Sequence, residues 1–113
     1  MRALATLTAL FLTGCGISAE NYQPKYAEAY CEWALECLDD AVLEFNGWSD
    51  LETCVPDFGG RYQTITEGCV YDAKAAKKCL KAMKKHPCSS APDVPAECET
   101  AFICDGATED SGA

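Results

Sequence analysis

The cysteine content of this chain constrains its fold more than any other feature. Nine of its 113 residues are cysteine, about 8%, which approaches the proportion that marks a disulfide scaffold in a short secreted chain. A domain of this length buries only a modest core, so cross-links supply stability that packing alone does not. Nine is an odd number, and one cysteine therefore has no partner within the chain.

The N-terminus has the arrangement of a signal peptide. Arg2 carries a single positive charge, and the stretch from Ala3 to Leu12 is apolar apart from two threonines. This stretch is too short for a transmembrane helix, which needs about 20 mostly apolar residues. A buried N-terminal helix of the domain is the other interpretation, and Gly14 and Gly16 disfavour it because glycine weakens a helix.

The residues Leu12-Thr13-Gly14-Cys15 follow directly and resemble a lipobox, the processing signal of bacterial lipoproteins. The resemblance implies that residues 1–14 are a lipoprotein signal peptide, that Cys15 is acylated, and that the lipid anchors the protein firmly to a membrane. In enteric lipoproteins an aspartate directly after the cysteine favours inner-membrane retention. Gly16 stands there instead, so the resemblance implies the outer membrane.

Ordinary secretion is the alternative interpretation of the same segment. Ile17-Ser18-Ala19 is a passable small-residue site, and cleavage after Ala19 would release a free disulfide-rich binding module. Either cleavage leaves an even number of cysteines in an oxidising compartment. We therefore expect four disulfides among Cys31, Cys37, Cys54, Cys69, Cys79, Cys88, Cys98 and Cys104.

The spacing of these cysteines limits their pairing. Cys31 and Cys37 lie six residues apart on one predicted helix, about 9 Å along its axis, which is too far for them to bridge each other. A helical hairpin around Asn46-Gly47 instead predicts a bridge from Cys37 to Cys54. Eight cysteines allow 105 connectivities, and the remaining pairs stay open.

Apolar periodicity predicts an all-α fold, a small disulfide-stapled bundle of four to five helices over residues 24–105. The preceding residues, 15–23, are small and polar and are expected to form a tether, and residues 106–113 a flexible acidic tail. The first helix is predicted to begin at Pro24 and to end at Asn46-Gly47. Its apolar face comprises Tyr26, Tyr30, Trp33, Ala34, Cys37, Leu38, Ala41 and Phe45, and its other side carries Glu28, Glu32, Glu36, Asp39, Asp40 and Glu44.

The second helical region is predicted to begin with a capping box on Ser49 and Glu52 and to continue to Thr66. Pro56 and the pair Gly59-Gly60 are expected to break it into two short helices, and the alternation over 61–66 leaves a short strand as an alternative. A last short helix is expected from Pro95 to Cys104.

Residues Ala73 to His86 form the clearest predicted helix, with Asp72 as its N-cap. The apolar arc comprises Ala75, Ala76, Cys79, Leu80, Ala82 and Met83, and the opposite arc comprises Lys74, Lys77, Lys78, Lys81, Lys84 and Lys85. These six lysines are the solvated side of an amphipathic helix in one interpretation. In the other they contact an anionic surface near the membrane.

Charge and motifs exclude several functions. The formal net charge is -9, which argues against simple nucleic-acid binding, because that binding needs a basic surface. The chain lacks chelating C-x2-C spacings and recognised catalytic motifs. His86 lies close to Cys88, and one interpretation of this pair is a Cys-His nucleophile. We favour the other interpretation, that His86 is placed at the helix C-terminus because a cation is favoured there. We therefore expect no metal, no cofactor and no enzymatic activity.

The whole pattern resembles small cysteine-rich helical lipoproteins of the myxobacterial type. The matching positions are Tyr30-Cys31-Glu32, Cys37, Ser49-Asp50-Leu51, Cys54, Cys69, Lys78-Cys79-Leu80, Cys88, Cys98 and Cys104. The resemblance implies a location and a fold without supplying a reaction. We accordingly expect a membrane-anchored interaction or envelope protein, whose partners are the membrane, reached through the lipid anchor, and an anionic surface or a protein.

Overall fold

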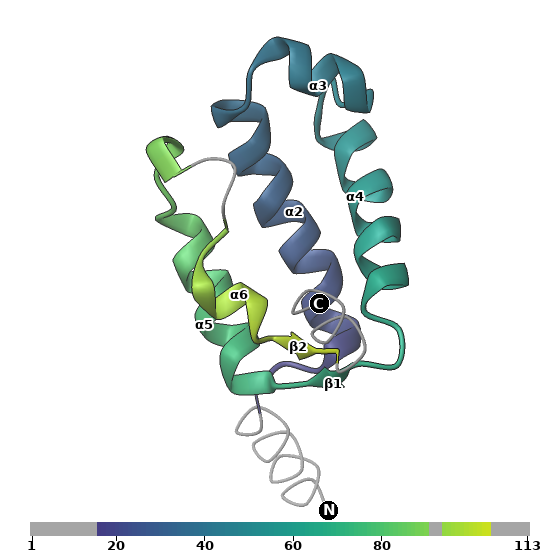
Figure 1. Ribbon diagram of the computed structural model, residues 1–113, viewed down its shortest axis with the longest axis vertical. Coiled ribbons are helices and arrows are strands. Elements are labelled where there is room, and N and C mark those ends of the chain that lie inside the picture. Colours follow the sequence, from purple (N-terminus) through teal and green to yellow (C-terminus); the bar gives the residue numbers. More distant parts are fainter. Residues whose placement is uncertain (1–15, 91–93, 105–113) are drawn as a thin grey trace, which may run out of the picture.

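The computed structural model describes residues 16–90 and 94–104. Within them the chain forms five α-helices, one 3-10 turn and a two-stranded ladder, joined by four disulfides (Figure 1). The predicted all-helical, disulfide-stapled bundle is confirmed, and the ladder is an addition to it. The predicted signal peptide, Cys15 and the tail over 106–113 lie outside the described residues.

Helix α2 spans Ala19–Cys37 and begins five residues earlier than predicted. Ser18 is its N-cap, and the Ser18 hydroxyl accepts a hydrogen bond from the Asn21 backbone N–H at 3.2 Å. Pro24 therefore lies inside the helix rather than at its start. Residues 19–23 are helical instead of forming a tether, because Tyr22 is fully buried and contributes its ring to the core.

The long first helix predicted from the periodicity is interrupted at Leu38. Leu38 and Asp39 have extended backbone angles, and a separate helix, α3, spans Asp40–Asn46. Gly47 ends α3 in the left-handed conformation, with φ 77°, which glycine adopts without steric cost. Because the break ends the shared periodicity, Phe45, assigned to the apolar face, is 89% exposed.

Helix α4 spans Leu51–Ile65 and begins one residue later than its predicted cap implies. Asp50 is the N-cap, and its carboxylate accepts a hydrogen bond from the Thr53 N–H at 3.0 Å. The Thr53 hydroxyl accepts in return from the Asp50 N–H at 3.1 Å. The predicted capping box on Ser49 and Glu52 is therefore displaced by one residue.

The residues expected to break α4 are accommodated within a single helix. Pro56 removes one N–H from the helical ladder without ending it. Gly59 lies against α2, where an added Cβ would be 3.4 Å from the Cβ of Ala27, while nothing lies within 4 Å of such a Cβ at Gly60. The predicted break is wrong, and residues 61–65 are helical rather than a strand.

Helix α5 spans Ala73–Lys84 and matches its prediction closely. The Asp72 carboxylate accepts hydrogen bonds from the backbone N–H groups of Lys74 and Ala75, at 3.0 and 3.2 Å, which confirms the N-cap. The helix ends two residues before His86, where the chain turns toward the 3-10 turn η1 at Cys88–Ser90.

The C-terminal segment is only partly helical. Helix α6 spans Ala96–Glu99, and strand β2 at Phe102–Ile103 pairs antiparallel with strand β1 at Val70–Tyr71. The helix predicted from Pro95 to Cys104 is thus wrong beyond Glu99. Successive strand side chains point to opposite faces, so Phe102 packs against the core while Ile103 is 46% exposed.

Four disulfides fix the alignment of these elements. The pairs are Cys31–Cys54, Cys37–Cys88, Cys69–Cys104 and Cys79–Cys98. Cys31 and Cys37 do not bridge each other, as predicted, but the predicted Cys37–Cys54 bridge is wrong. Because α3 is inserted between the two long helices, α4 aligns with the middle of α2, and Cys54 meets Cys31 with 5.9 Å between their Cα atoms.

Helix α2 is the central element of the bundle. It packs against α4 on one side and α5 on the other, and α6 packs against α5 (Figure 1). The largest fully buried side chains are Tyr22, Cys31, Cys54 and Cys79. The core therefore runs along α2 and contains the sulfur atoms of two of the bridges.

Candidate functional site

The six predicted lysines form one exposed surface on α5 and the residue that caps it, which we call the lysine face. All of them are exposed, and the opposite side of the helix is buried through Ala76, Cys79 and Met83. The predicted separation into a basic arc and an apolar arc is confirmed. The acidic residues predicted for the first helix are also exposed, and they are divided between α2, α3 and the break that separates them.

A second surface, which the sequence did not predict, is an apolar groove of about 870 Å³. Side chains of α2, α3, α4 and the α6–β2 segment line it. In the ribbon, α3 lies at one end of the α2–α4 pair and β2 at the other (Figure 1). We call this second surface the aromatic groove. Its apolar lining comprises Tyr26, Tyr30, Leu38, Val42, Trp48, Phe58, Tyr62, Ile65, Val94, Cys98, Phe102 and Cys104, and its polar lining Asn46, Arg61, Thr66 and Glu99.

Packed aromatic rings make the floor of this groove. Tyr30 and Phe58 stack with centroids 4.1 Å apart and planes inclined by 5°, and Phe58 stacks on Tyr62 at 6.1 Å and 11°. Tyr26 lies 4.7 Å from Tyr62 on the same floor. Such ring pairs add stability beyond the area that they bury, so the floor is a preformed surface that α2 and α4 build together.

The tyrosine hydroxyls of this floor are neutral. Burial removes water from the rings and raises the pKa of Tyr26, Tyr30 and Tyr62 above the ordinary tyrosine value. The Tyr62 hydroxyl donates a hydrogen bond to the hydroxyl of the fully buried Tyr22 at 3.5 Å, and the Tyr22 hydroxyl donates to the Cys79 sulfur at 3.2 Å. The floor therefore presents aromatic surface and uncharged hydroxyls.

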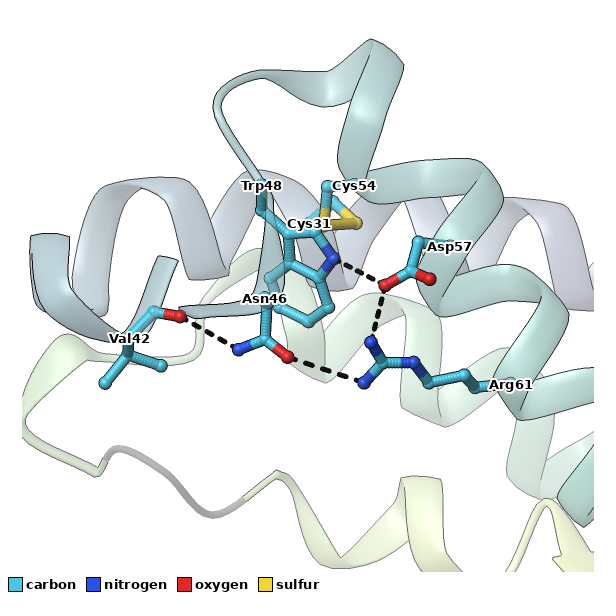
Figure 2. A network of polar contacts seen from close by, with 7 residues as sticks. All are labelled: Cys31, Val42, Asn46, Trp48, Cys54, Asp57 and Arg61. Atoms are coloured by element: carbon cyan, nitrogen blue, oxygen red, sulfur yellow. Dashed lines mark hydrogen bonds and ion pairs between the residues drawn. A yellow bond between two sulfur atoms is a disulfide. The ribbon is translucent and has the colours of Figure 1, made fainter. Parts of the chain in front are cut away.

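A small polar network stands at the α3 end of the groove (Figure 2). Asp57 accepts a hydrogen bond from the Trp48 indole N–H at 2.8 Å and pairs with the Arg61 guanidinium at 2.8 Å. The Arg61 guanidinium also donates to the Asn46 side-chain oxygen at 3.4 Å and lies 5.9 Å from the centre of the Trp48 ring. The network thus fixes Trp48 in the wall of the groove and supplies Arg61 with a counter-charge.

The other residues considered from the sequence do not form a site. Cys88 is bonded to Cys37, so the His86–Cys88 pair has no free thiol, and the His86 ring lies 5.3 Å from Trp33. Within residues 16–90 and 94–104, no group of three or more His, Cys, Asp or Glu side chains is arranged to hold a metal ion. None of the helices described here combines the length and the apolar character needed to cross a bilayer.

Sequence reasoning assigned Tyr26 and Tyr30 to the apolar face of the first predicted helix, where they do lie, and together with Phe58 and Tyr62 of α4 they line the groove. The surface they form was missed, because a helical face is filled or left open by elements that are distant in the sequence. One signal was present. Aromatic residues recur every four positions at 22, 26 and 30, and again at 58 and 62, which gives two aromatic stripes.

Comparisons of the chain with protein-family models, with curated proteins and with solved structures gave no match. Its function is therefore inferred from the sequence and from the two surfaces.

Proposed function

We propose that this protein is an extracytoplasmic envelope lipoprotein, anchored through acylated Cys15, that acts by binding rather than by catalysis. The four disulfides support a location outside the cytoplasm, because cytosolic thiols are kept reduced. The lipobox resemblance at residues 12–15 supports the anchor. By that resemblance, Gly16 after the cysteine favours the outer membrane.

The observation that carries the proposal is that residues 16–18 belong to the fold. The Ile17 carbonyl accepts a hydrogen bond from the Tyr71 hydroxyl at 2.7 Å, and Ser18 caps α2. Cleavage after Ala19 would remove both contacts, and losing a side-chain cap costs about 1 kcal/mol. Cleavage before Cys15 keeps both of them, which favours the anchored protein over the secreted alternative.

The position of the same segment supports an anchor that lies beside the lysine face. An added Cβ at Gly16 would lie 3.7 Å from the Cβ of Ala73, the first residue of α5. The acylated cysteine would therefore join the fold where the lysine face begins, at Lys74 and Lys77. Each lysine near an anionic membrane surface contributes on the order of 1 kcal/mol of attraction, so anchor and lysine face are proposed to act on the same membrane.

Mass spectrometry of the protein purified from membranes tests the anchor. The proposal predicts an N-terminal Cys15 carrying acyl chains, and it predicts that Cys15→Ser abolishes this modification and releases the protein from membranes. Ala19→Leu is the matched variant, because it blocks cleavage after residue 19 and leaves the lipobox intact; anchoring should be unchanged. A mature N-terminus at Glu20 without acyl groups would refute the proposal.

A further inference from the structure

We propose that the aromatic groove binds one acyl chain of a membrane lipid. Its volume of about 870 Å³ lies within the range of small-molecule sites. Rings from α2 and α4 form the floor, and aliphatic side chains border it. The choice of a lipid among apolar ligands rests on the proposed function, which places the groove at a membrane.

The exposure of the border residues shows that the groove is open to a ligand. Val42 is 42% exposed and Ile65 is 68% exposed, although both line the groove. Exposed apolar side chains next to a large apolar concavity are characteristic of binding surfaces. A ligand seated there would remove this apolar area from water.

The charges of the groove favour an uncharged ligand segment. Among the residues that the structure describes, Arg61 is the only cationic one that lines the groove, and the Asp57 carboxylate pairs with it at 2.8 Å. Glu99 is the only anionic lining residue within 16–90 and 94–104. The groove therefore offers no unbalanced positive charge for a phosphate or carboxylate, and a hydrocarbon chain matches its lining better than a charged headgroup does.

Once the proposed signal peptide is removed, the two segments that adjoin the described residues near the groove do not supply a matching occupant. The segment that follows Cys104 at the border of the groove is Asp-Gly-Ala-Thr-Glu-Asp-Ser-Gly-Ala, and residues 91–93 are Ala-Pro-Asp. Neither contains a large apolar side chain. A second copy of the protein, inserting its exposed Phe45, is an alternative that the following experiment separates from a lipid.

The test measures quenching of Trp48 by a zwitterionic lysophospholipid that carries bromine atoms on its acyl chain, added below its micelle concentration. The protein is the chain with residues 1–15 replaced by a cleavable secretory leader, which keeps every described helix, strand and disulfide. Trp33→Phe leaves Trp48 as the single tryptophan. The zwitterionic headgroup gives the lysine face no net charge to attract, and the leader removes the anchor, so failure here is distinct from failure of the acylation test.

Two matched pairs of variants locate the binding. Val42→Glu and Ile65→Glu place a charge in the groove, whereas Val70→Glu and Ile103→Glu place one on exposed apolar residues of the ladder, 65% and 46% exposed, outside the groove lining. The proposal predicts saturable quenching in the parent and in both ladder variants. It predicts affinity weaker by about tenfold or more in both groove variants, because a charge in an apolar site must be desolvated.

Three outcomes would overturn the proposal. The first is no quenching by the brominated lipid in the parent protein. The second is equal quenching in all four variants, which would indicate binding elsewhere. The third is a lipid-independent dimer, measured by sedimentation, that forms in the parent and is lost in Phe45→Ala and Ile65→Glu, which would assign the groove to a second copy.

Discussion

The lysine face comes from a single segment, whereas side chains from four helices and a strand line the aromatic groove. The lysine face needs only the amphipathic pattern of α5 and its contacts with α2 and α6. The aromatic groove needs α2 and α4 to lie side by side in one alignment, with α3 and the α6–β2 segment at its ends. The two surfaces therefore depend to very different degrees on contacts between segments that are distant in the sequence.

The bridges explain how so small a domain maintains the second surface. Cys31–Cys54 joins α2 directly to α4 (Figure 2), and Cys69–Cys104 ties the start of β1 to the end of β2. A domain of this size has about 5 to 15 kcal/mol of total stability. Each bridge contributes a large part of that total stability, so the stability of the groove depends on its disulfides.

Removal of Cys31–Cys54 is expected to have the largest effect on the groove. The double variant Cys31→Ala/Cys54→Ala opens a loop of 23 residues and should lower the free energy of unfolding by about 3 kcal/mol or more, measured in urea. Near-ultraviolet circular dichroism should lose the signal of the packed rings.

The pair Cys37→Ala/Cys88→Ala sharpens this comparison. It opens a longer loop of 51 residues and should cost about 4 kcal/mol, yet this bridge joins α2 to η1 rather than to α4. The ring signal should persist at temperatures where the variant is folded. A ring signal lost in this variant and kept in the Cys31/Cys54 variant would contradict our assignment of the bridges.

Alkaline pH should destabilise the aromatic region. Burial raises the pKa of Tyr22 and Tyr26 above the ordinary value of 10.0, so above pH 10 the unfolded chain loses protons that the folded chain retains. The contribution of these tyrosines to the free energy of unfolding is therefore fully present below pH 10. Above pH 10 the free energy of unfolding should fall with rising pH, by about 1.4 kcal/mol per pH unit for each such tyrosine.

Urea unfolding on either side of pH 10 measures this slope. Tyr22→Phe keeps most of the packing and should reduce the slope by one proton. An unchanged slope in this variant would mean that Tyr22 does not carry the effect.

Two neighbouring glycines test the contact between α2 and α4. Gly60→Ala should stabilise the protein by about 1 kcal/mol, because alanine favours the helix and nothing lies within 4 Å of the added Cβ. Gly59→Leu should destabilise it by about 1 to 3 kcal/mol by pushing α4 away from Ala27. Thermal unfolding of both variants decides the point, and equal effects at the two positions would exclude a close contact at Gly59.

The lysine face should affect stability least. Replacing Lys77, Lys81 and Lys84 by glutamine should change the free energy of unfolding by less than about 0.5 kcal/mol. Salt-sensitive binding to anionic vesicles should nevertheless weaken by about fivefold for each lysine that faces the membrane. Lys25→Gln, an exposed substitution on α2, is the control and should leave binding unchanged. Undiminished vesicle binding by the triple variant would contradict membrane contact and would indicate that the lysines are only the solvated side of the helix.

Local patterns explain what could be predicted from the sequence. The arcs of α5, its Asp72 cap and the Gly47 turn depend on residues within a few positions of one another. The break at Leu38 was missed because the acidic residues around it were assigned to an exposed face, although Asp39 is at the N-cap of α3. The unbroken α4 was missed because its glycine faces a neighbouring helix, which the periodicity of α4 alone does not reveal.

The groove could not be predicted because it depends on pairings between distant segments. The two aromatic stripes are visible in the sequence, but whether they meet depends on which cysteine of α2 bonds to Cys54. A bridge from Cys37 would align α4 with the end of α2, whereas the bridge from Cys31 sets Phe58 against Tyr30. A difference of six residues in one pairing thus determines whether the floor of the groove forms.

A non-reducing peptide map measures this pairing directly. Combined cleavage after glutamate and after lysine or arginine places each of the eight bonded cysteines on its own peptide. The structure predicts linked peptides for Cys31–Cys54, Cys37–Cys88, Cys69–Cys104 and Cys79–Cys98. Linkage of Cys37 to Cys54 would contradict the alignment of α2 with α4, and with it the aromatic groove.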